Sequence, residues 1–236
     1  MFFLDKRLVF PHPDYANDDG ILAIGGDLST ERLLLAYQNG IFPWYEEIDP
    51  EILEDENEKF SEKETIIWWS PDPRMVLYPD KLKVSKSMRK LLRQNNFTVT
   101  VNKAFEDVID NCQQIFRTDQ ENTWITKNMK SAYIELHKKG FAHSVEVWEG
   151  DELVGGLYGV NVGKVFCGES MFSNKSNTSK LAFIYLVREL EKRDYHMIDC
   201  QVYTEHLESL GAEEISREKF LKELYEFRDH EAWNYK

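Results

Sequence analysis

Two short segments carry side chains suited to acid–base or orienting chemistry. Residues 168–172 read Gly-Glu-Ser-Met-Phe, residues 198–201 read Ile-Asp-Cys-Gln, and both are predicted to be β-strands. Because side chains alternate along a strand, Asp199 and Gln201 are expected on one face, where an acid lies beside an amide. The alternative is two polar residues on a solvated strand face. His206 follows as a candidate base, but a single His without an identified partner is more typical of a structural residue.

Hydrophobic periodicity predicts the elements that must position these side chains: an antiparallel meander of three strands, then a helix and one more strand. Their order predicts an α+β protein in which an antiparallel-rich mixed sheet is flanked by helices. It resembles the fold of the acetyl-CoA-dependent N-acetyltransferases, the GNAT fold. The strands are expected at residues 97–101, 143–149, 153–160, 165–172 and 197–203, and the helices at 105–112, 127–136 and 179–192.

The turn before the last of these helices argues against a coenzyme A site. N-Acetyltransferases that bind coenzyme A have a glycine-containing turn here, so that bare backbone amides face the pyrophosphate. Residues 173–178 read Ser-Asn-Lys-Ser-Asn-Thr and contain no glycine. An acetyltransferase is nevertheless one alternative, which a failure to bind coenzyme A in calorimetry would exclude.

Residues 1–65 are expected to form a small N-terminal domain, and residues 66–236 the GNAT-like catalytic domain. The N-terminal part is rich in glycine and proline turns and contains one predicted helix, which Ser29 or Thr30 can cap and Gly40 can end. Residues 46–64 hold ten acidic residues and two lysines without apolar periodicity, which predicts a solvated acidic loop.

The net charge of −13 excludes a generally basic nucleic-acid coat, because phosphate binding needs clustered Lys and Arg. One region is different. Residues 81–93 contain six basic residues and no acidic one, and most of the basic residues lie opposite the apolar side of a predicted helix. The pattern fits either a solvated helix face or a phosphate-contacting surface formed by Lys83, Lys86, Arg89, Lys90 and Arg93.

The sequence predicts a cytoplasmic protein. Its first residues contain no apolar stretch long enough for a secretory signal, and no apolar run reaches membrane-spanning length. Cys112, Cys167 and Cys200 are widely spaced and form no CxxC pair, which disfavours a disulfide framework or a structural zinc site. They are expected to be buried, reduced thiols.

Nine short motifs, in a fixed order between about residue 8 and residue 225, indicate a family. Each motif alone is weak, but with the ordered set the chain resembles the bacterial leucyl/phenylalanyl-tRNA-protein transferases. The motifs are residues 20–29 (GILAIGGDLS), 40–44 (GIFPW), 68–74 (WWSPDPR), 123–126 (TWIT), 143–148 (HSVEVW), 155–159 (GGLYG), 168–173 (GESMFS), 198–201 (IDCQ) and 209–212 (SLGA).

The resemblance implies an aminoacyltransferase. Such an enzyme moves Leu or Phe, and less readily Met, from its tRNA onto the N-terminal Lys or Arg of an acceptor protein, which marks the acceptor for N-end rule degradation. No cofactor, metal or membrane is implied, and a monomer is expected. Because the aminoacyl ester is already activated, the enzyme must mainly orient two substrates and manage one proton.

The resemblance also gives roles to the acid and amide residues. Asp199 and Gln201 are expected to be the central catalytic pair, with the amide nitrogen of Gln201 bonded to Asp199 and its carbonyl oxygen directed at the attacking amine. A group on the terminal ribose of the tRNA would carry the proton. Glu169 would hold the amine or the basic side chain of the acceptor.

The other residues implied by the resemblance bind the tRNA and its amino acid. A flexible Met suits a pocket that takes both aliphatic and aromatic groups, and aromatic platforms contribute about 1–3 kcal/mol per stacked base. The basic helix face described above becomes the expected track of the acceptor stem. The expected aminoacyl pocket is Leu157, Phe166, Ser170, Met171 and Phe172, and the expected site for the terminal adenosine is Trp44, Trp124 and Tyr133.

The acidic loop is longer than this family generally has at this place. Because it would repel phosphate, it is expected either to fold away from the tRNA or to lower the affinity for tRNA at low salt. Deleting residues 49–63 should therefore leave transfer of a labelled amino acid intact. A loss of activity in a deletion variant that still folds would show that the loop takes part.

A non-catalytic RNA-binding module is the second alternative. It would need the basic helix face but not Asp199, Gln201 or Glu169. Substituting these three residues would then leave its function unchanged.

Overall fold

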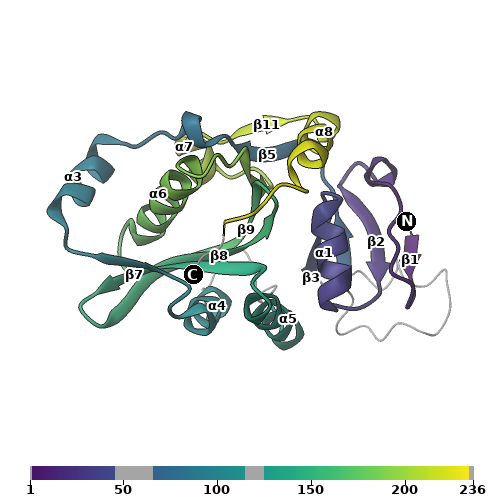
Figure 1. Ribbon diagram of the computed structural model, residues 1–236, viewed down its shortest axis with the longest axis horizontal. Helices are drawn as coiled ribbons and strands as arrows, with labels where there is room; N and C mark the ends of the chain where they lie inside the picture. Colours follow the sequence, from purple (N-terminus) through teal and green to yellow (C-terminus); the bar gives the residue numbers. More distant parts are fainter. Residues whose placement is uncertain (1, 46–65, 115–124, 234–236) are drawn as a thin grey trace.

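The computed structural model describes residues 2–45, 66–114 and 125–233. The predicted acidic loop at 46–64 and Trp124 therefore lie outside the described residues, and the expected result of deleting the loop stays a prediction. The described strands form two sheets, one of four strands and one of seven. The smaller sheet lies at one end of the molecule, on the right in Figure 1.

The smaller sheet has the strand order β1-β2-β4-β3. Strands β1 and β2 are parallel, while β4 is antiparallel to both of its neighbours. Helix α1 begins after Ser29, whose hydroxyl accepts a hydrogen bond from the backbone N–H of Arg32, so the predicted cap is confirmed. The bounds are β1 Phe2–Leu4, η1 Pro13–Tyr15, β2 Ile21–Gly25, α1 Thr30–Gln38, β3 Phe42–Tyr45 and β4 Ile66–Trp69.

Strand β4 belongs to the smaller sheet although it begins after residue 65. It lies between β2 and β3, so a boundary before Ile66 would divide the sheet. The expected boundary after residue 65 would therefore separate β4 from the sheet to which it belongs. The division of the chain into two domains stays a prediction.

The larger sheet has the strand order β11-β5-β10-β9-β8-β7-β6. Strands β9 and β10 are parallel, and the other neighbouring pairs are antiparallel. The predicted meander is β7, β8 and β9, and the predicted α+β class with a mixed sheet is confirmed. The strand bounds are β5 Arg74–Leu77, β6 Thr98–Val101, β7 Ala142–Glu149, β8 Glu152–Val162, β9 Val165–Ser173, β10 Met197–Gln201 and β11 Glu213–Ile215.

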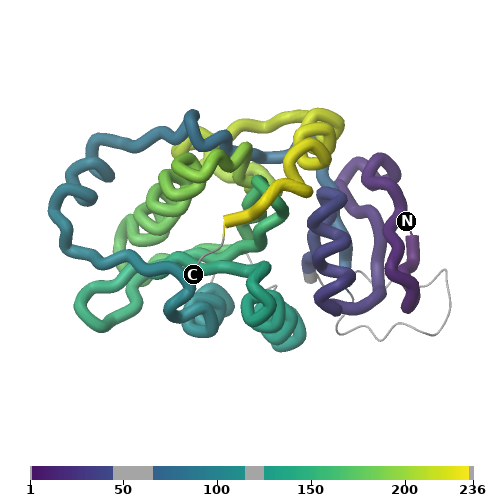
Figure 2. The backbone as a smooth tube through the Cα atoms, in the orientation of Figure 1, coloured from purple at the N-terminus to yellow at the C-terminus, as the bar shows by residue number. Residues whose placement is uncertain are grey.

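Helices cover both faces of the larger sheet (Figure 1). Helices α4 and α5 pack on one face, and α6 packs on the other with α3 beyond it. Figure 2 shows that α8, near the C-terminal end of the chain, lies beside α1, where the Arg228 guanidinium donates to the Gln38 carbonyl oxygen at 2.6 Å. The bounds are η2 Pro79–Lys81, α3 Lys86–Gln94, α4 Phe105–Gln114, α5 Lys127–Lys138, α6 Thr178–Glu191, α7 Glu205–Ser209 and α8 Arg217–Phe227.

The parallel pairing of β9 and β10 is short. It covers three residue pairs and ends where Asp199 lies opposite Cys167. Just beyond this point each strand has a β-bulge, a residue without a pairing partner. Glu169 of β9 has no partner on β8, and Cys200 of β10 has no partner on β5. Such bulges redirect side chains and end strand pairing, and they occur often beside active sites. The two strands therefore diverge beside Glu169, Asp199 and Gln201, the candidate residues predicted from the sequence.

The three cysteines are free. Cys112 and Cys167 are buried, and Cys200 is half-buried. No helix in the described ranges is both long enough and apolar enough to cross a membrane.

Candidate active site

Asp199 is held by a buried ion pair. The Nε and Nη2 atoms of Arg74, on β5, donate to its two carboxylate oxygens at 2.8 Å and 2.7 Å. Both residues are only 1% exposed. Such two-point, charge-assisted hydrogen bonds fix the orientation of both groups. The carboxylate of Asp199 is thus fully engaged inside the protein.

Gln201 leaves the regular strand at the Cys200 bulge. Its φ angle is 66°, a left-handed value that residues with a side chain seldom adopt. The backbone N–H of Gln201 donates to Oδ1 of Asp199 at 2.9 Å, while its side-chain Nε2 donates to Oε1 of Glu169 at 2.9 Å. The expected bond between the side-chain amide of Gln201 and Asp199 is therefore wrong, because the bulge turns this side chain toward β9.

Glu169 ends a chain of hydroxyl groups. The Tyr133 hydroxyl donates to Oε2 of Glu169 at 2.6 Å, and the hydroxyls of Tyr37 and Tyr133 are 2.5 Å apart. Burial raises the pKa of both tyrosines well above its usual range, so both hydroxyls keep their protons. Burial also raises the pKa of Glu169 to about 7, although the hydrogen bonds from Tyr133 and Gln201 oppose this shift.

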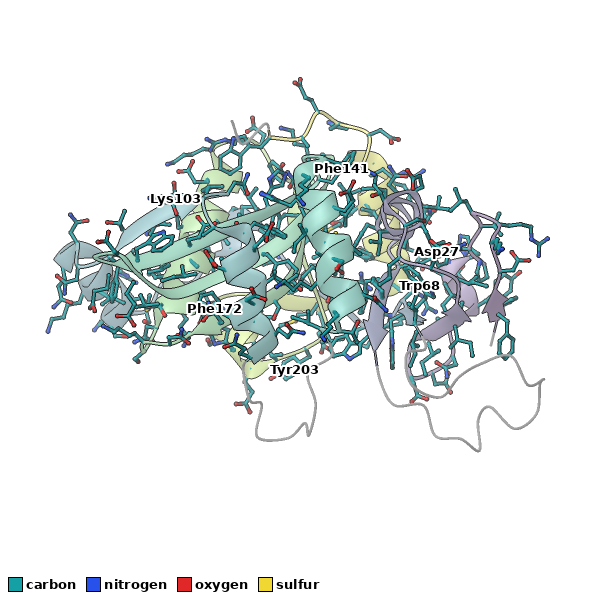
Figure 3. The ribbon with its side chains drawn as sticks, turned by 90° about the horizontal axis from the view of Figure 1, so that it is seen from below. Asp27, Trp68, Lys103, Phe141, Phe172 and Tyr203 are labelled. Atoms are coloured by element: carbon teal, nitrogen blue, oxygen red, sulfur yellow. The ribbon has the colours of Figure 1, made fainter. Side chains whose placement is uncertain are left out.

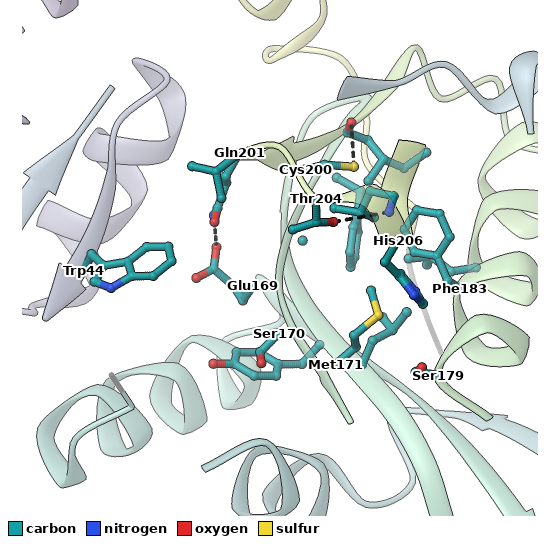
Figure 4. Close-up of a pocket in the computed structure, with 18 residues that line it drawn as sticks. Trp44, Glu169, Ser170, Met171, Ser179, Phe183, Cys200, Gln201, Thr204 and His206 are labelled. Carbon is teal, nitrogen blue, oxygen red and sulfur yellow. Dashed lines mark hydrogen bonds between the residues drawn. The ribbon is translucent and has the colours of Figure 1, made fainter. Parts of the chain in front are cut away.

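A cavity of about 340 Å³ opens beside Glu169 and Gln201 (Figure 4). Its lining is mostly apolar, and Trp44 of the smaller sheet lies at one side of it, next to Glu169. The residues that line it are Trp44, Leu157, Tyr158, Phe166, Gly168, Glu169, Ser170, Met171, Ser179, Phe183, Leu186, Ile198, Cys200, Gln201, Val202, Thr204, His206 and Leu207.

Four of the five expected pocket residues line this cavity: Leu157, Phe166, Ser170 and Met171. Phe172 does not. It is 1% exposed and packs on the opposite face of the sheet, beside α4 (Figure 3). The expectation failed because Met171 and Phe172 are neighbours on a strand and point to opposite faces.

The three expected adenosine residues have different positions. Trp44 is partly exposed and lines the cavity. Tyr133 has no exposed surface and makes an edge-on contact with Tyr158, at 5.4 Å between ring centroids, so it offers no open face to a base. Its placement as a stacking platform is therefore wrong, since its hydroxyl is the part that reaches the site. Trp124 lies outside the described residues.

Several cavity residues were not expected. Ser179, Phe183 and Leu186 come from α6, and their i, i+4, i+7 spacing marks the side of the helix that faces the sheet.

Arg74 lies within the WWSPDPR motif, but the sequence gives it no partner. His206 lines the cavity, and burial lowers the pKa of its imidazole. In the described part of the chain its Nε2 has no hydrogen-bond partner, so it is not a paired base.

The five basic residues expected to contact phosphate are all exposed, and four of them lie on α3. Lys81, just before them, is paired with Glu213 at 2.6 Å. Within the described residues, none of the five forms an ion pair with a carboxylate, so their charges are available to a ligand. Helix α3 lies on the same side of the sheet as α6, which forms one wall of the cavity (Figure 1).

Comparisons with known proteins agree with these motifs. A family model described as "Leucyl/phenylalanyl-tRNA protein transferase" matches residues 76–225, and the model of its N-terminal domain matches residues 26–53. A leucyl/phenylalanyl-tRNA--protein transferase from Flavobacterium johnsoniae is 56% identical over 95% of this chain and 99% of its own length. The one from Christiangramia forsetii is 53% identical over 95% of this chain and 100% of its own.

Solved structures of other proteins are only distantly similar. A protein of unknown function from Staphylococcus epidermidis gives a TM-score of 0.42 at 10% identity over 75% of this chain and 68% of its own. L-PGS from Bacillus licheniformis gives 0.39 at 12% identity over 80% and 57%. The relatives at more than half identity, which extend over nearly the whole chain, decide the matter: this chain belongs to the leucyl/phenylalanyl-tRNA protein transferase family.

Proposed function

We propose that this protein transfers Leu or Phe, and less readily Met, from aminoacyl-tRNA to the N-terminal Lys or Arg of acceptor proteins, and so marks them for N-end rule degradation. The observation that carries the proposal is the hydrogen-bonded pair of Glu169 and Gln201 at the edge of an apolar cavity, in a chain of this family. The reaction needs both parts, because the apolar side chain of the transferred residue must be held in place while a polar amine attacks the carbonyl carbon of its ester.

The cavity would hold the transferred side chain. Its volume of about 340 Å³ lies within the range of small-molecule pockets. Leu157 and Phe166 form rigid apolar walls from the sheet, and Phe183 adds an aromatic wall from α6. Met171 has a flexible, polarizable side chain that adjusts to either a branched or an aromatic group.

Gln201 would orient the attacking amine. Its Nε2 donates to Glu169, so its carbonyl oxygen is the part left to accept a hydrogen bond from the amine. As the new C–N bond forms and the ester C–O bond breaks, the proton passes to the departing tRNA oxygen through the terminal ribose. A neutral amide is a poor base, so Gln201 acts by orientation. Glu169 supplies negative charge for the acceptor's amine or its basic side chain.

The tRNA would be bound at two places. Trp44, beside Glu169 in Figure 4, is the described candidate for stacking on the terminal adenosine, with Trp124 as the second. The acceptor stem would follow the exposed basic side chains of α3 and the residues before it, which are Lys83, Lys86, Arg89, Lys90 and Arg93.

Reversing three of these charges should weaken tRNA binding without harming the chemical step. Lys86, Arg89 and Lys90 replaced together by Glu are expected to raise KM for aminoacyl-tRNA at least about 10-fold, with kcat unchanged. The slope of log affinity against log salt should fall by roughly one unit for each lost phosphate contact.

The matched control carries the same change of charge elsewhere. Lys6, Lys138 and Lys222 are also exposed, and none of them lies on α3. Their joint replacement by Glu should change KM much less. Equal effects of the two triple variants would mean that only the total charge of the protein matters.

We further propose that the larger domain is GNAT-like and that the protein is a cytoplasmic monomer. The support for the fold is the β9-α6-β10 unit, in which two parallel strands pair briefly and then diverge beside the cavity. The N-terminal domain, drawn to include β4, would supply Trp44 to this site.

Transfer of labelled Leu or Phe from charged tRNA to a synthetic peptide tests the function. A peptide beginning with Arg should be labelled, and one of otherwise identical sequence beginning with Asp should not be. Equal labelling of both peptides would contradict the proposed acceptor specificity, and labelling of neither would contradict the proposed function.

A further inference from the structure

We infer that Arg74 is a positioning residue for the transfer reaction: by holding Asp199, it keeps Gln201 in the conformation that presents its side chain to the amine. The inference rests on the proposed function and explains how the site is kept in place. Gln201 is 6% exposed and has a φ angle of 66°. A left-handed non-glycine residue persists only where its surroundings hold it.

Asp199 is the group that holds the backbone of Gln201. Its Oδ1 accepts the Gln201 backbone N–H at 2.9 Å, directly across the bulge. This bond ties the turn of the backbone to the orientation of one carboxylate. If that carboxylate rotated, the backbone N–H would lose its partner and the side chain of Gln201 would move away from Glu169.

Arg74 prevents that rotation. Its guanidinium meets both oxygens of Asp199 at 2.8 Å and 2.7 Å, and a two-point contact fixes the carboxylate plane. Asp199 Oδ1 therefore accepts from Arg74 and from Gln201 at the same time. The ion pair therefore does more than neutralise charge, because it fixes the orientation of the Asp199 oxygen that accepts the backbone N–H of Gln201.

Two aromatic rings fix the guanidinium in turn. Its carbon lies 4.7 Å from the centroid of Phe42, on β3 of the smaller sheet, and 4.6 Å from that of Phe220, on α8. A planar guanidinium can stack on rings and bind a carboxylate edge-on, whereas the compact ammonium of Lys cannot do both. The chain of contacts therefore runs from the interface of the two sheets through Arg74 and Asp199 to Gln201.

Replacing Arg74 by Lys tests this role, because the positive charge is kept and the two-point contact is lost. We expect kcat for transfer to an Arg-initiated peptide to fall about 100-fold, the effect of a misplaced reacting group, with KM for aminoacyl-tRNA within about 2-fold of wild type. Arg32→Lys is the matched control. Arg32 is also fully buried, but it bonds to the backbone carbonyls of Asp5 and Arg7, away from the cavity.

The two variants separate positioning from mere stability. Thermal unfolding should show a loss of stability in both, while only Arg74→Lys should lose kcat. Unchanged kcat in a folded Arg74→Lys variant, or an equal loss of kcat in Arg32→Lys, would overturn the inference. If wild type itself does not label the Arg peptide, the proposed function fails instead.

A milder variant decides the matter if Arg74→Lys does not fold. Phe220→Leu keeps the ion pair but removes one of the two rings that flank the guanidinium. It should lower kcat at least about 5-fold with KM for aminoacyl-tRNA unchanged, a smaller effect than misplacing the reacting group outright. A wild-type kcat in this variant would count against the inference.

Discussion

Gln201→Gly is expected to lower kcat for transfer by at least about 100-fold, while the free energy of unfolding stays within about 1 kcal/mol of wild type. The activity is lost because the side chain that would orient the amine is gone. The fold is kept because glycine adopts a φ angle of 66° without strain, which offsets the entropy that glycine gains in the unfolded chain.

Asn177→Gly is the matched control. Asn177 also has a left-handed φ, of 69°, but it is exposed at the start of α6 and does not line the cavity. This variant should keep kcat near the wild-type value. Steady-state kinetics with saturating aminoacyl-tRNA and denaturant unfolding give the two quantities. If Gln201→Gly kept wild-type kcat, Gln201 would have no part in catalysis.

Glu169→Gln is expected to lower kcat about 10- to 100-fold near pH 8 and to remove a pH dependence centred near 7. In wild type the ionised carboxylate accepts hydrogen bonds from Tyr133 and Gln201, so transfer should rise as pH passes the raised pKa of about 7. In the variant, the remaining rise should follow the attacking amine, whose usual pKa is about 8.

Stability should respond in the opposite sense. Because folding raises the pKa of Glu169 from 4.5 to about 7, the folded protein binds this proton more tightly, and the favourable contribution is lost as pH rises between those values. Relative to wild type, Glu169→Gln should therefore gain stability across this window, by at most about 1.4 kcal/mol per pH unit. Urea unfolding at pH 5 and pH 8 measures the difference.

Glu146→Gln provides the control for the pH–rate measurement. Glu146 is another acid of the same sheet, fully buried, but its carboxylate accepts from Thr100 and Ser144 and lies outside the cavity lining. Its replacement should leave the midpoint of the pH–rate profile at the wild-type value. A midpoint that moves in both variants, or in neither, would show that the ionisation of Glu169 does not control the rate of transfer.

Local pattern predicted the meander and the helix that follows it well. The meander and the following helix were expected at 143–172 and 179–192, and the structure has β7 to β9 within 142–173 and α6 at Thr178–Glu191. Alternation, turn residues and helical spacing are properties of neighbouring residues, so a single sequence contains them. The same alternation already separates Met171 from Phe172, which the family resemblance alone had grouped together.

The contacts of the site were harder to predict because distant segments make them. The bulge that turns Gln201 away from the side chain of Asp199 depends on pairing with β5, more than 100 residues earlier in the chain. Tyr37, Tyr133 and Glu169 form one group of hydrogen-bonded side chains, and these three residues come from α1, α5 and β9. Nothing in the local sequence around any of them specifies the other two.

The placement of Phe42, Trp44 and Tyr37 has a consequence for the evolution of this enzyme. A segment that began at β5 would keep Glu169, Asp199 and Gln201, yet it would lose the ring that stacks on Arg74, the tryptophan at the cavity and the last hydroxyl of the tyrosine chain. The two sheets are thus unsuited to independent shuffling between genes. An exchange of the smaller sheet alone would have to preserve Phe42, Trp44 and Tyr37 to leave these contacts intact.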